Sequence, residues 1–310
     1  MAAQRSGRSG PAVGYLLLAA LLCTAMLAAC GTASIGGPAV GAVSATAHAL
    51  TVDGRARTYD VVAPAGAHGP LPMIMILHGR YVDPSIEEPR TGFLPLAQQG
   101  KAILVYPVGY DQSWNAGGCC GDAAADDVDD TAFLTATVGE VASHYPIDRS
   151  RVYLVGYSNG ARMAFTEICA QPGVFAAFAV FAAAPTQTCR NTGVPVPVLI
   201  SDGTADPELA TTDPPRTATQ VIDGVVTAWR ARDGCSAASD NSAVPPARLT
   251  LWTDCRLGSA VESLLYNGLS HFWPSATQTN LPYSADVGQA AAGATLMWAF
   301  LDAHRTPTDA

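Results

Sequence analysis

Basic residues are scarce in this sequence, and lysine is almost absent. The 310 residues include 17 Lys and Arg against 26 Asp and Glu, and Lys101 is the one lysine. Binding to nucleic acid or to an anionic lipid surface requires a basic patch, which so few basic residues do not supply. We therefore expect no nucleic-acid partner.

The chain also lacks internal repeats, heptads and a second long apolar run. A helix that crosses a bilayer needs about 20 consecutive apolar residues, and no segment after residue 29 has them. Hydrophobic residues make up 49% of the chain, which is enough to build one core. We expect a single folded domain, residues 47–305.

The N-terminus has the pattern of an export signal. Arg5 and Arg8 precede the apolar run 15–22, which is typical of a secretory signal peptide. The sequence Leu-Ala-Ala-Cys at 27–30 resembles a bacterial lipobox, in which Cys30 is diacylated and becomes the mature N-terminus. Two acyl chains hold a protein at a membrane far better than one. A plain cleaved signal peptide is the alternative.

These features predict the location and the first segments of the protein. Residues 1–29 are a lipoprotein signal peptide, and residues 30–46, which carry no charge, are a flexible tether. The protein is exported, either to the outer face of the cell membrane as a lipoprotein or to the extracellular space. Without the signal peptide, 15 basic and 26 acidic residues leave a net charge of −11.

Cysteine usage agrees with export. Apart from Cys23 and Cys30, the sequence has six cysteines: Cys119, Cys120, Cys169, Cys189, Cys235 and Cys255. An even number in an exported chain indicates disulfides. The 15 possible connectivities stay open. In one of them, Cys169–Cys189 and Cys235–Cys255 each close a short loop, and Cys119–Cys120 is a vicinal bridge. The six lack the paired C-x-x-C spacing of zinc ribbons, so we expect no metal.

A Gly-x-Ser-x-Gly sequence spans residues 156–160. It follows the β-branched run 151–155 and precedes a predicted helix start at 161–165. In that context the pattern predicts a nucleophile elbow, a strand–turn–helix that lifts a serine hydroxyl above the sheet. Ser158 is then a candidate nucleophile, and the amide of Asn159 is a candidate oxyanion donor. An ordinary Gly/Ser/Asn turn is the alternative.

A serine nucleophile needs a base and an acid, which follow it in the order acid, then histidine, in this kind of fold. His271 follows the strand-like segment 261–266, whereas His304 lies in a polar tail. We predict that His271 is the base. Asp206 lies further along the loop than Asp202, which stands at a strand end and suits a turn-capping role. We predict that Asp206 is the acid.

Other residues are expected to complete this site. The loop after the predicted strand 72–77 offers the Arg80 amide as a second oxyanion donor, and His78 is expected to be structural. Trp114 and Trp273 lie in loops near the site and are candidates for substrate binding, although buried packing accounts for them equally well. The acidic run 126–130 is interpreted as a helix cap in preference to a calcium loop. No cofactor is expected.

The motifs LHG, SWNAGGCCG, VDDTAFL, GYSNGARMAF, DGTADP and GLSHFWP resemble the polyhydroxybutyrate depolymerase and feruloyl esterase family of α/β-hydrolases, over residues 47–302. The resemblance implies a secreted serine esterase with Ser158 as nucleophile, Asp206 as acid and His271 as base. It implies hydroxyalkanoate, feruloyl or acetyl esters as substrates. Arg80 and Tyr81 depart from it, since the family has small residues or a cysteine there.

The order of elements predicts the fold class. A hairpin around 52–54 is followed by strands near 72–78, 102–106, 151–155, 177–182, 195–201 and 261–266, with helices between them. This alternation predicts an α/β-hydrolase fold, a mostly parallel sheet with helices on both faces. Two other functions remain open, namely acyl transfer to a cell-envelope alcohol and a non-catalytic surface binding lipoprotein.

Overall fold

The computed structural model describes residues 41–66, 69–82, 84–189, 193–277 and 280–306. The predicted signal peptide and lipidation at Cys30 lie outside these residues. The first strand begins at Val43, so the end of the predicted tether already belongs to the sheet.

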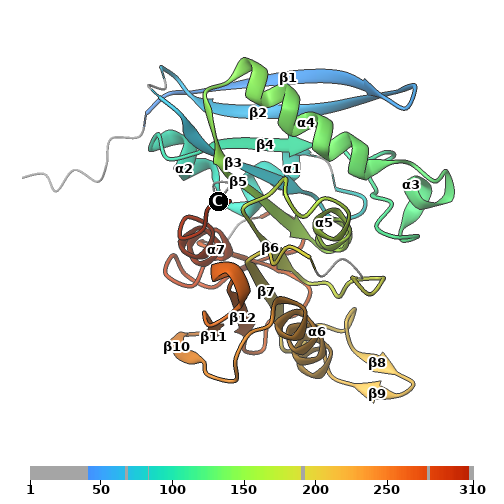
Figure 1. The fold of residues 1–310 in the computed structure, drawn as a ribbon, viewed down its shortest axis with the longest axis vertical. Helices are drawn as coiled ribbons and strands as arrows, with labels where there is room; N and C mark the ends of the chain where they lie inside the picture. Colours follow the sequence, from blue (N-terminus) through green and yellow to red (C-terminus); the bar gives the residue numbers. More distant parts are fainter. Residues whose placement is uncertain (1–40, 67–68, 83, 190–192, 278–279, 307–310) are drawn as a thin grey trace, which may run out of the picture. The chain divides into compact units, whose positions relative to one another are not determined.

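A ten-stranded sheet forms the centre of the fold (Figure 1), in the order β1-β2-β4-β3-β5-β6-β7-β12-β11-β10. Its strands are β1 (Val43–Val52), β2 (Arg55–Pro64), β3 (Leu71–Leu77), β4 (Ile103–Pro107), β5 (Ile147–Tyr157), β6 (Ala177–Phe181), β7 (Val198–Gly203), β10 (Asp240–Val244), β11 (Ala247–Trp252) and β12 (Val261–Tyr266). The six central strands, from β4 to β12, are parallel. The antiparallel pairs are confined to the two edges.

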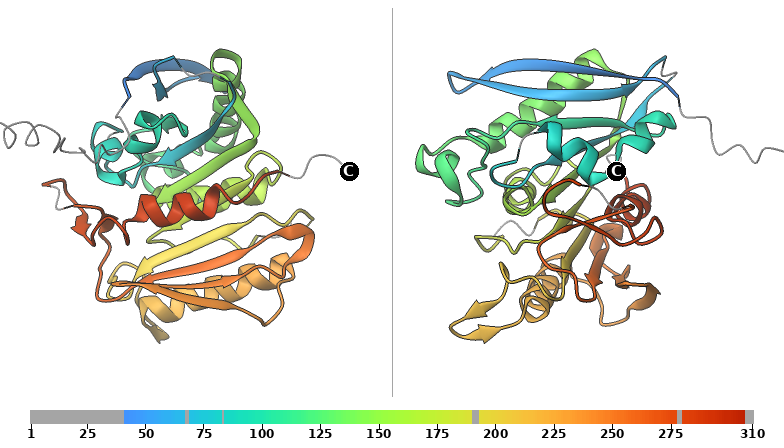
Figure 2. Two further views of the ribbon diagram at one scale, coloured as in Figure 1. Left: turned by 90° about the vertical axis from the view of Figure 1, so that its left-hand side faces the viewer. Right: turned by 180° about the vertical axis from the view of Figure 1, so that it is seen from behind.

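Helices cover both faces of this sheet. They are α1 (Pro84–Thr91), α2 (Leu94–Gln98), α3 (Gly121–Ala125), α4 (Asp130–His144), α5 (Asn159–Ala170), α6 (Ala218–Asp233) and α7 (Gly293–Leu301). One core lies under α4, α5 and α6, and the other under α2 and α7. Figure 2, left, looks onto the face covered by α7 (red). The fold is therefore the predicted α/β arrangement.

The strand sequences explain why both faces are covered. In β3, Met73 and Met75 enter one core while Ile74 and Ile76 enter the other, and all four side chains are buried. Central parallel strands have such continuous apolar runs because helices pack on both of their faces.

Several strands and one helical turn were not predicted from the sequence. The last two strands of the large sheet, β11 and the edge strand β10, form a hairpin. Two small sheets pair β8 (Thr211–Thr212) with β9 (Pro215–Arg216) and β13 (Trp273–Ser275) with β14 (Ser284–Asp286). A 3-10 turn, η1, spans Arg256–Gly258. Within the described residues, no helix is both long and apolar enough to cross a bilayer.

The cysteines pair in one of the connectivities that the sequence left open, and the acidic run caps a helix as predicted. The structure contains the disulfides Cys119–Cys120, Cys169–Cys189 and Cys235–Cys255. Asp129, within the acidic run, is the N-cap of α4 and accepts a 2.8 Å hydrogen bond from the amide of Ala132. Such a cap satisfies one of the unpaired amides of the first helical turn.

Candidate active site

Ser158 stands at a sharp turn between β5 and α5, and its backbone adopts φ 53° and ψ −117°. A non-glycine residue at positive φ is strained, and such strain is typical of functional turns. A Cβ atom on Gly156 would lie 2.4 Å from the Gly160 carbonyl oxygen, and one on Gly160 would lie 2.4 Å from that of Leu77. Both glycines are therefore required for the turn, which has the predicted form of a nucleophile elbow.

Ser158, His271 and Asp206 are joined by hydrogen bonds, although they come from three separate loops. His271 Nε2 lies 2.9 Å from Ser158 Oγ, and Nδ1 lies 2.7 Å from Asp206 Oδ2. Because a carboxylate can only accept, the imidazole proton lies on Nδ1 and Nε2 accepts from the serine hydroxyl. The structure thus brings the predicted nucleophile, base and acid together.

The carboxyl group of Asp206 is fully buried and ionised. Burial by itself raises its pKa, but hydrogen bonds and charge from His271, and hydrogen bonds from Asp202 and the Glu208 amide, outweigh that effect. The resulting pKa lies below the ordinary aspartate value. Oδ1 accepts the Glu208 amide at 2.7 Å, which leaves Oδ2 directed at the imidazole.

Asp202 contacts Asp206 and does more than cap its own turn. Its Oδ1 accepts the amide of Gly203 at 2.7 Å, as its position at a strand end predicts. Burial, together with the charge of Asp206, raises the pKa of Asp202 to about 9. Treated as a carboxylate, Asp202 has a buried Oδ2 with no donor. A proton on the group resolves this, since it is donated to Asp206. Sequence reasoning did not identify this contact.

The two candidate oxyanion donors are available. Within the described part of the chain, neither the Asn159 amide nor the Arg80 amide has a hydrogen-bond partner. The Asn159 side chain holds the loop of Trp114, because its Oδ1 accepts the Trp114 amide at 2.8 Å. A Cβ on Gly79 would lie 3.4 Å from Ser158 Cβ, so Arg80 follows a residue that packs against the candidate nucleophile.

Trp114 and Trp273 do not provide a substrate-facing surface, and this prediction is wrong. Both side chains are 0% exposed. Their indole N–H groups donate to the carbonyls of His78 and Thr91, at 2.9 Å and 3.2 Å. Packing therefore accounts for both. Trp273 opens the strand β13, whose three residues are all buried, whereas its neighbour Phe272, just before the strand, is 42% exposed.

The exposed aromatic side chains near the site are different ones. Tyr81 follows Arg80 and is 71% exposed, whereas Tyr283 packs against Phe272 with ring centroids 6.1 Å apart. Tyr81 and Phe272 each adjoin a residue of the candidate site in the sequence, a signal that could have identified them.

His78 and His304 are engaged elsewhere. His78 is buried, its Nδ1 donates to the Gly79 carbonyl at 2.7 Å, and its Nε2 accepts the Gly109 amide at 2.9 Å. The structural role predicted for His78 follows from these two bonds. His304 Nδ1 donates to the Phe300 carbonyl at 2.8 Å.

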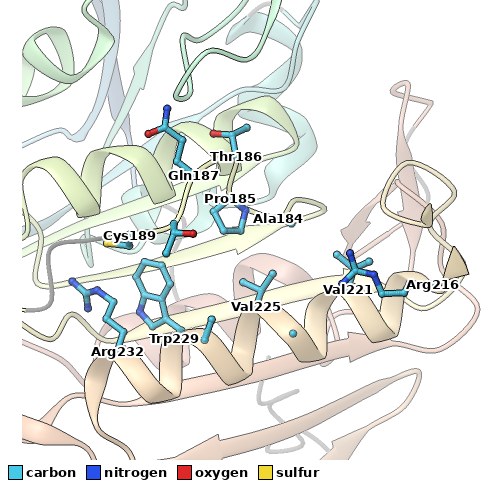
Figure 3. A pocket seen from close by; sticks show the side chains of 13 residues that line it. Ala184, Pro185, Thr186, Gln187, Cys189, Arg216, Val221, Val225, Trp229 and Arg232 are labelled. Atoms are coloured by element: carbon cyan, nitrogen blue, oxygen red, sulfur yellow. The ribbon is translucent and has the colours of Figure 1, made fainter. Parts of the chain in front are cut away.

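A cavity of about 430 Å³ lies between the 184–189 loop and α6 (Figure 3). Pro185, Val225 and Trp229 are among its lining residues, and Ser158, Asp206 and His271 are not. Thr186 and Gln187 tie its loop to the carbonyls of Ala116 and Gly117. The cavity is thus distinct from the site formed by Ser158, His271 and Asp206.

The chain is similar in sequence to proteins named as esterases. It is 32% identical over 168 residues to NocK of Nocardia uniformis subsp. tsuyamanensis, covering 52% of this chain and 48% of that protein. It is 27% identical over 232 residues to the bifunctional acetylxylan esterase/xylanase XynS20E of Neocallimastix patriciarum, covering 70% and 31%. A protein assigned as feruloyl esterase C in Aspergillus niger is 27% identical over 165 residues, covering 51% and 57%.

The chain therefore spans about half or less of the length of the first two of these relatives. No family model matches the sequence. Among solved structures, the feruloyl esterase module of Clostridium thermocellum has a TM-score of 0.55 at 12% identity, with 76% of this chain and 84% of that chain covered. The acetyl xylan esterase of Aspergillus awamori has a TM-score of 0.54 at 15% identity, with 73% and 94% covered.

These likenesses agree with the topology described above. The fold is that of an α/β-hydrolase, and the sequence relatives are named as esterases.

Proposed function

We propose that the protein is a serine carboxylic-ester hydrolase that works through an acyl-enzyme on Ser158. The observation that supports this most directly is the unbroken hydrogen-bonded line from Ser158 through His271 to Asp206, starting at a strained elbow. A serine hydroxyl is a weak nucleophile at neutral pH, and such a line is what activates it.

In the first half of the reaction, Ser158 Oγ attacks the ester carbonyl carbon as its proton moves to His271 Nε2. The negative charge that develops on the carbonyl oxygen is held by the amides of Asn159 and Arg80. The C–O bond to the alcohol then breaks, and the leaving oxygen takes the proton from Nε2. The acyl group remains on Ser158.

In the second half, a water molecule attacks the acyl-enzyme carbonyl and gives a proton to His271. Collapse of this intermediate breaks the bond to Ser158 Oγ, which takes the proton back as the carboxylic acid leaves. Asp206 stays ionised throughout. It fixes the proton on Nδ1 and stabilises the imidazolium that forms in each half.

The substrates proposed are feruloyl, acetyl or hydroxyalkanoate esters. The support is the family resemblance of the motifs and the names of the relatives, which include acetylxylan and feruloyl esterases. The exposed rings of Tyr81 and Phe272, next to residues of the site, suit an apolar acyl or aryl group.

We also propose that the protein acts outside the cytoplasm, held to the membrane through a lipidated Cys30. The lipobox-like sequence at 27–30 supports this. Three disulfides also support it, because such bonds form and persist in oxidising compartments.

The catalytic assignment is tested with Ser158→Ala, His271→Ala and, as the matched control, His304→Ala. Turnover of p-nitrophenyl acetate and methyl ferulate should fall at least about a thousandfold in the first two variants and stay at the wild-type level in the control. A fluorophosphonate probe should label the wild type and leave Ser158→Ala unlabelled. Near wild-type turnover by His271→Ala would show that the base is misassigned. Products formed with an added alcohol acceptor would reveal transferase activity.

A further inference from the structure

Two arginines stand beside Ser158, and neither is ion-paired with a carboxylate of the described residues. Arg162 is four residues beyond the nucleophile in α5, and Arg80 follows Gly79 in the loop after β3. Within the described residues, neither guanidinium takes part in an ion pair. Most other arginines of the core do, as Arg57 does with buried Asp130 at 2.7 Å.

The side chain of Arg162 lies against the loop that borders the candidate nucleophile. Its Nη1 is 3.1 Å from Cys119 Sγ and 3.6 Å from Cys120 Sγ. The Cys119 carbonyl in turn faces Asn159, whose Nδ2 is 3.5 Å away. Since helical side chains lean toward the N-terminus of their helix, the guanidinium of Arg162 lies over the turn that carries Ser158.

Arg80 approaches the same loop from the other strand. Its Cδ lies 3.7 Å from the position that a Cβ on Gly121 would occupy, so the two arginines flank residues 119–121. Arg162 is half-buried; burial and the charge of Arg80 both lower its pKa, and Glu208 opposes them. Glu208 follows Asp206 in the loop after β7. The charges of Arg80 and Glu208 thus shift the pKa of Arg162 in opposite directions.

Such an arrangement is unfavourable for the protein alone. Two like charges repel, and a half-buried guanidinium loses part of its hydration without an ion-pair partner in return. A carboxylate placed between them would relieve both effects, because a guanidinium binds that group through two parallel N–H···O bonds. None of the acidic residues that the structure describes supplies it here.

We propose that Arg80 and Arg162 bind a carboxylate carried by the ester substrate, so that the enzyme prefers esters with a negatively charged acyl or alcohol group. This inference rests on the proposed ester hydrolysis at Ser158. The Arg80 guanidinium carbon lies 4.9 Å from the centre of the Tyr81 ring, so Tyr81 then lies beside the proposed carboxylate site.

The test compares matched esters that differ by one charge. Mono(4-nitrophenyl) adipate against methyl 4-nitrophenyl adipate probes the acyl side, and 4-acetoxybenzoate against its methyl ester probes the alcohol side. The wild type should show a kcat/KM ratio of at least about ten in favour of the anion in one of the two pairs. The ratio should fall in 0.5 M NaCl, because salt screens exposed charges.

Arg162→Met should lower that ratio about tenfold and Arg162→Lys by less, since the lysine keeps the charge and loses the two-pronged geometry. Arg248→Met, which removes an exposed arginine on the strand β11, is the matched control and should keep the wild-type ratio. A wild-type ratio near one in both pairs, or the same ratio in Arg162→Met, overturns the inference while ester hydrolysis stands. Failure of the wild type to cleave any of the four esters overturns the proposed function itself.

Discussion

The carboxyl group of Asp202 donates a hydrogen bond to the carboxylate of Asp206, which accepts another from His271 Nδ1 at 2.7 Å. A protonated aspartate therefore stands behind the proposed catalytic acid at neutral pH. Its proton adds to the contributions of His271 and the Glu208 amide, which together outweigh the effect of burial on the pKa of Asp206.

Substitutions at Asp202 should separate this role from simple packing. In Asp202→Asn the amide can accept from Gly203 and donate to Asp206, so kcat should stay within about threefold of the wild type. Asp202→Leu removes the donor and should lower kcat at least about tenfold. Steady-state kinetics on a p-nitrophenyl ester measures both.

The pH profile provides a second readout. Above about pH 9 wild-type Asp202 loses its proton, and two adjacent buried carboxylates then repel each other. We expect kcat to fall on this alkaline side in the wild type and not in Asp202→Asn, whose amide does not titrate. If kcat of Asp202→Asn falls above pH 9 as it does in the wild type, the hydrogen bond described here is contradicted.

Asp206→Asn should lower kcat by about a thousandfold or more. The amide can donate to the imidazole as well as accept, so the proton is no longer held on Nδ1, and no charge remains to stabilise the imidazolium. Far-UV circular dichroism and the urea midpoint should show that the variant is folded. Asp223→Asn, at an exposed site on α6, is the matched control; a similar loss there would point to a non-specific effect.

The elbow and its partners were predictable because chain order and local sequence constrain them. Only glycine fits at positions 156 and 160, and the histidine and aspartate must follow the serine on later strands of this topology. The Gly-x-Ser-x-Gly motif therefore predicts the geometry of the elbow from five residues.

Other parts of the site depend on burial, which the sequence does not reveal. Phe272 and Trp273 are equivalent in the sequence, and the start of β13 decides which of them is buried. The proton on Asp202 depends on the burial of this strand residue and on the nearby charge of Asp206. The edge strand β10, Asp240–Val244, is mostly exposed and polar, so it has no apolar alternation to detect.

Cys30→Ser should release the protein from membranes. The proposed diacyl group provides tens of methylene groups, and each buried methylene contributes about 0.8 kcal/mol to membrane binding. Wild-type protein expressed with its signal should partition into the detergent phase of Triton X-114, and the variant into the aqueous phase. A mature wild type that is found in the aqueous phase, with an N-terminus other than Cys30, would contradict lipidation.

Glu167 should make the protein less stable as the pH rises from 4.5 to 8. Its side chain is buried in α5, Oε1 accepts the Thr135 hydroxyl at 3.1 Å, and Oε2 is buried without a partner. Burial, partly offset by hydrogen bonds from threonines, raises its pKa from 4.5 to about 8. Between these values the folded protein holds a proton that the unfolded chain has released, so the free energy of unfolding falls as the pH increases. From pH 5 to pH 8 the expected contribution is on the order of 3 kcal/mol.

Glu167→Gln places an uncharged amide at this position, with an oxygen for Thr135 and no ionisation. Buried Glu262 and Asp202, whose pKa values are also raised, shift stability in the same direction, so the comparison is between variant and wild type at each pH. In urea unfolding, the variant should gain stability over the wild type at pH 8, and this advantage should largely disappear at pH 5. Glu140→Gln, at an exposed position on α4, should show no such change. An equal difference between Glu167→Gln and wild type at both pH values would mean that Glu167 is ionised in the folded protein.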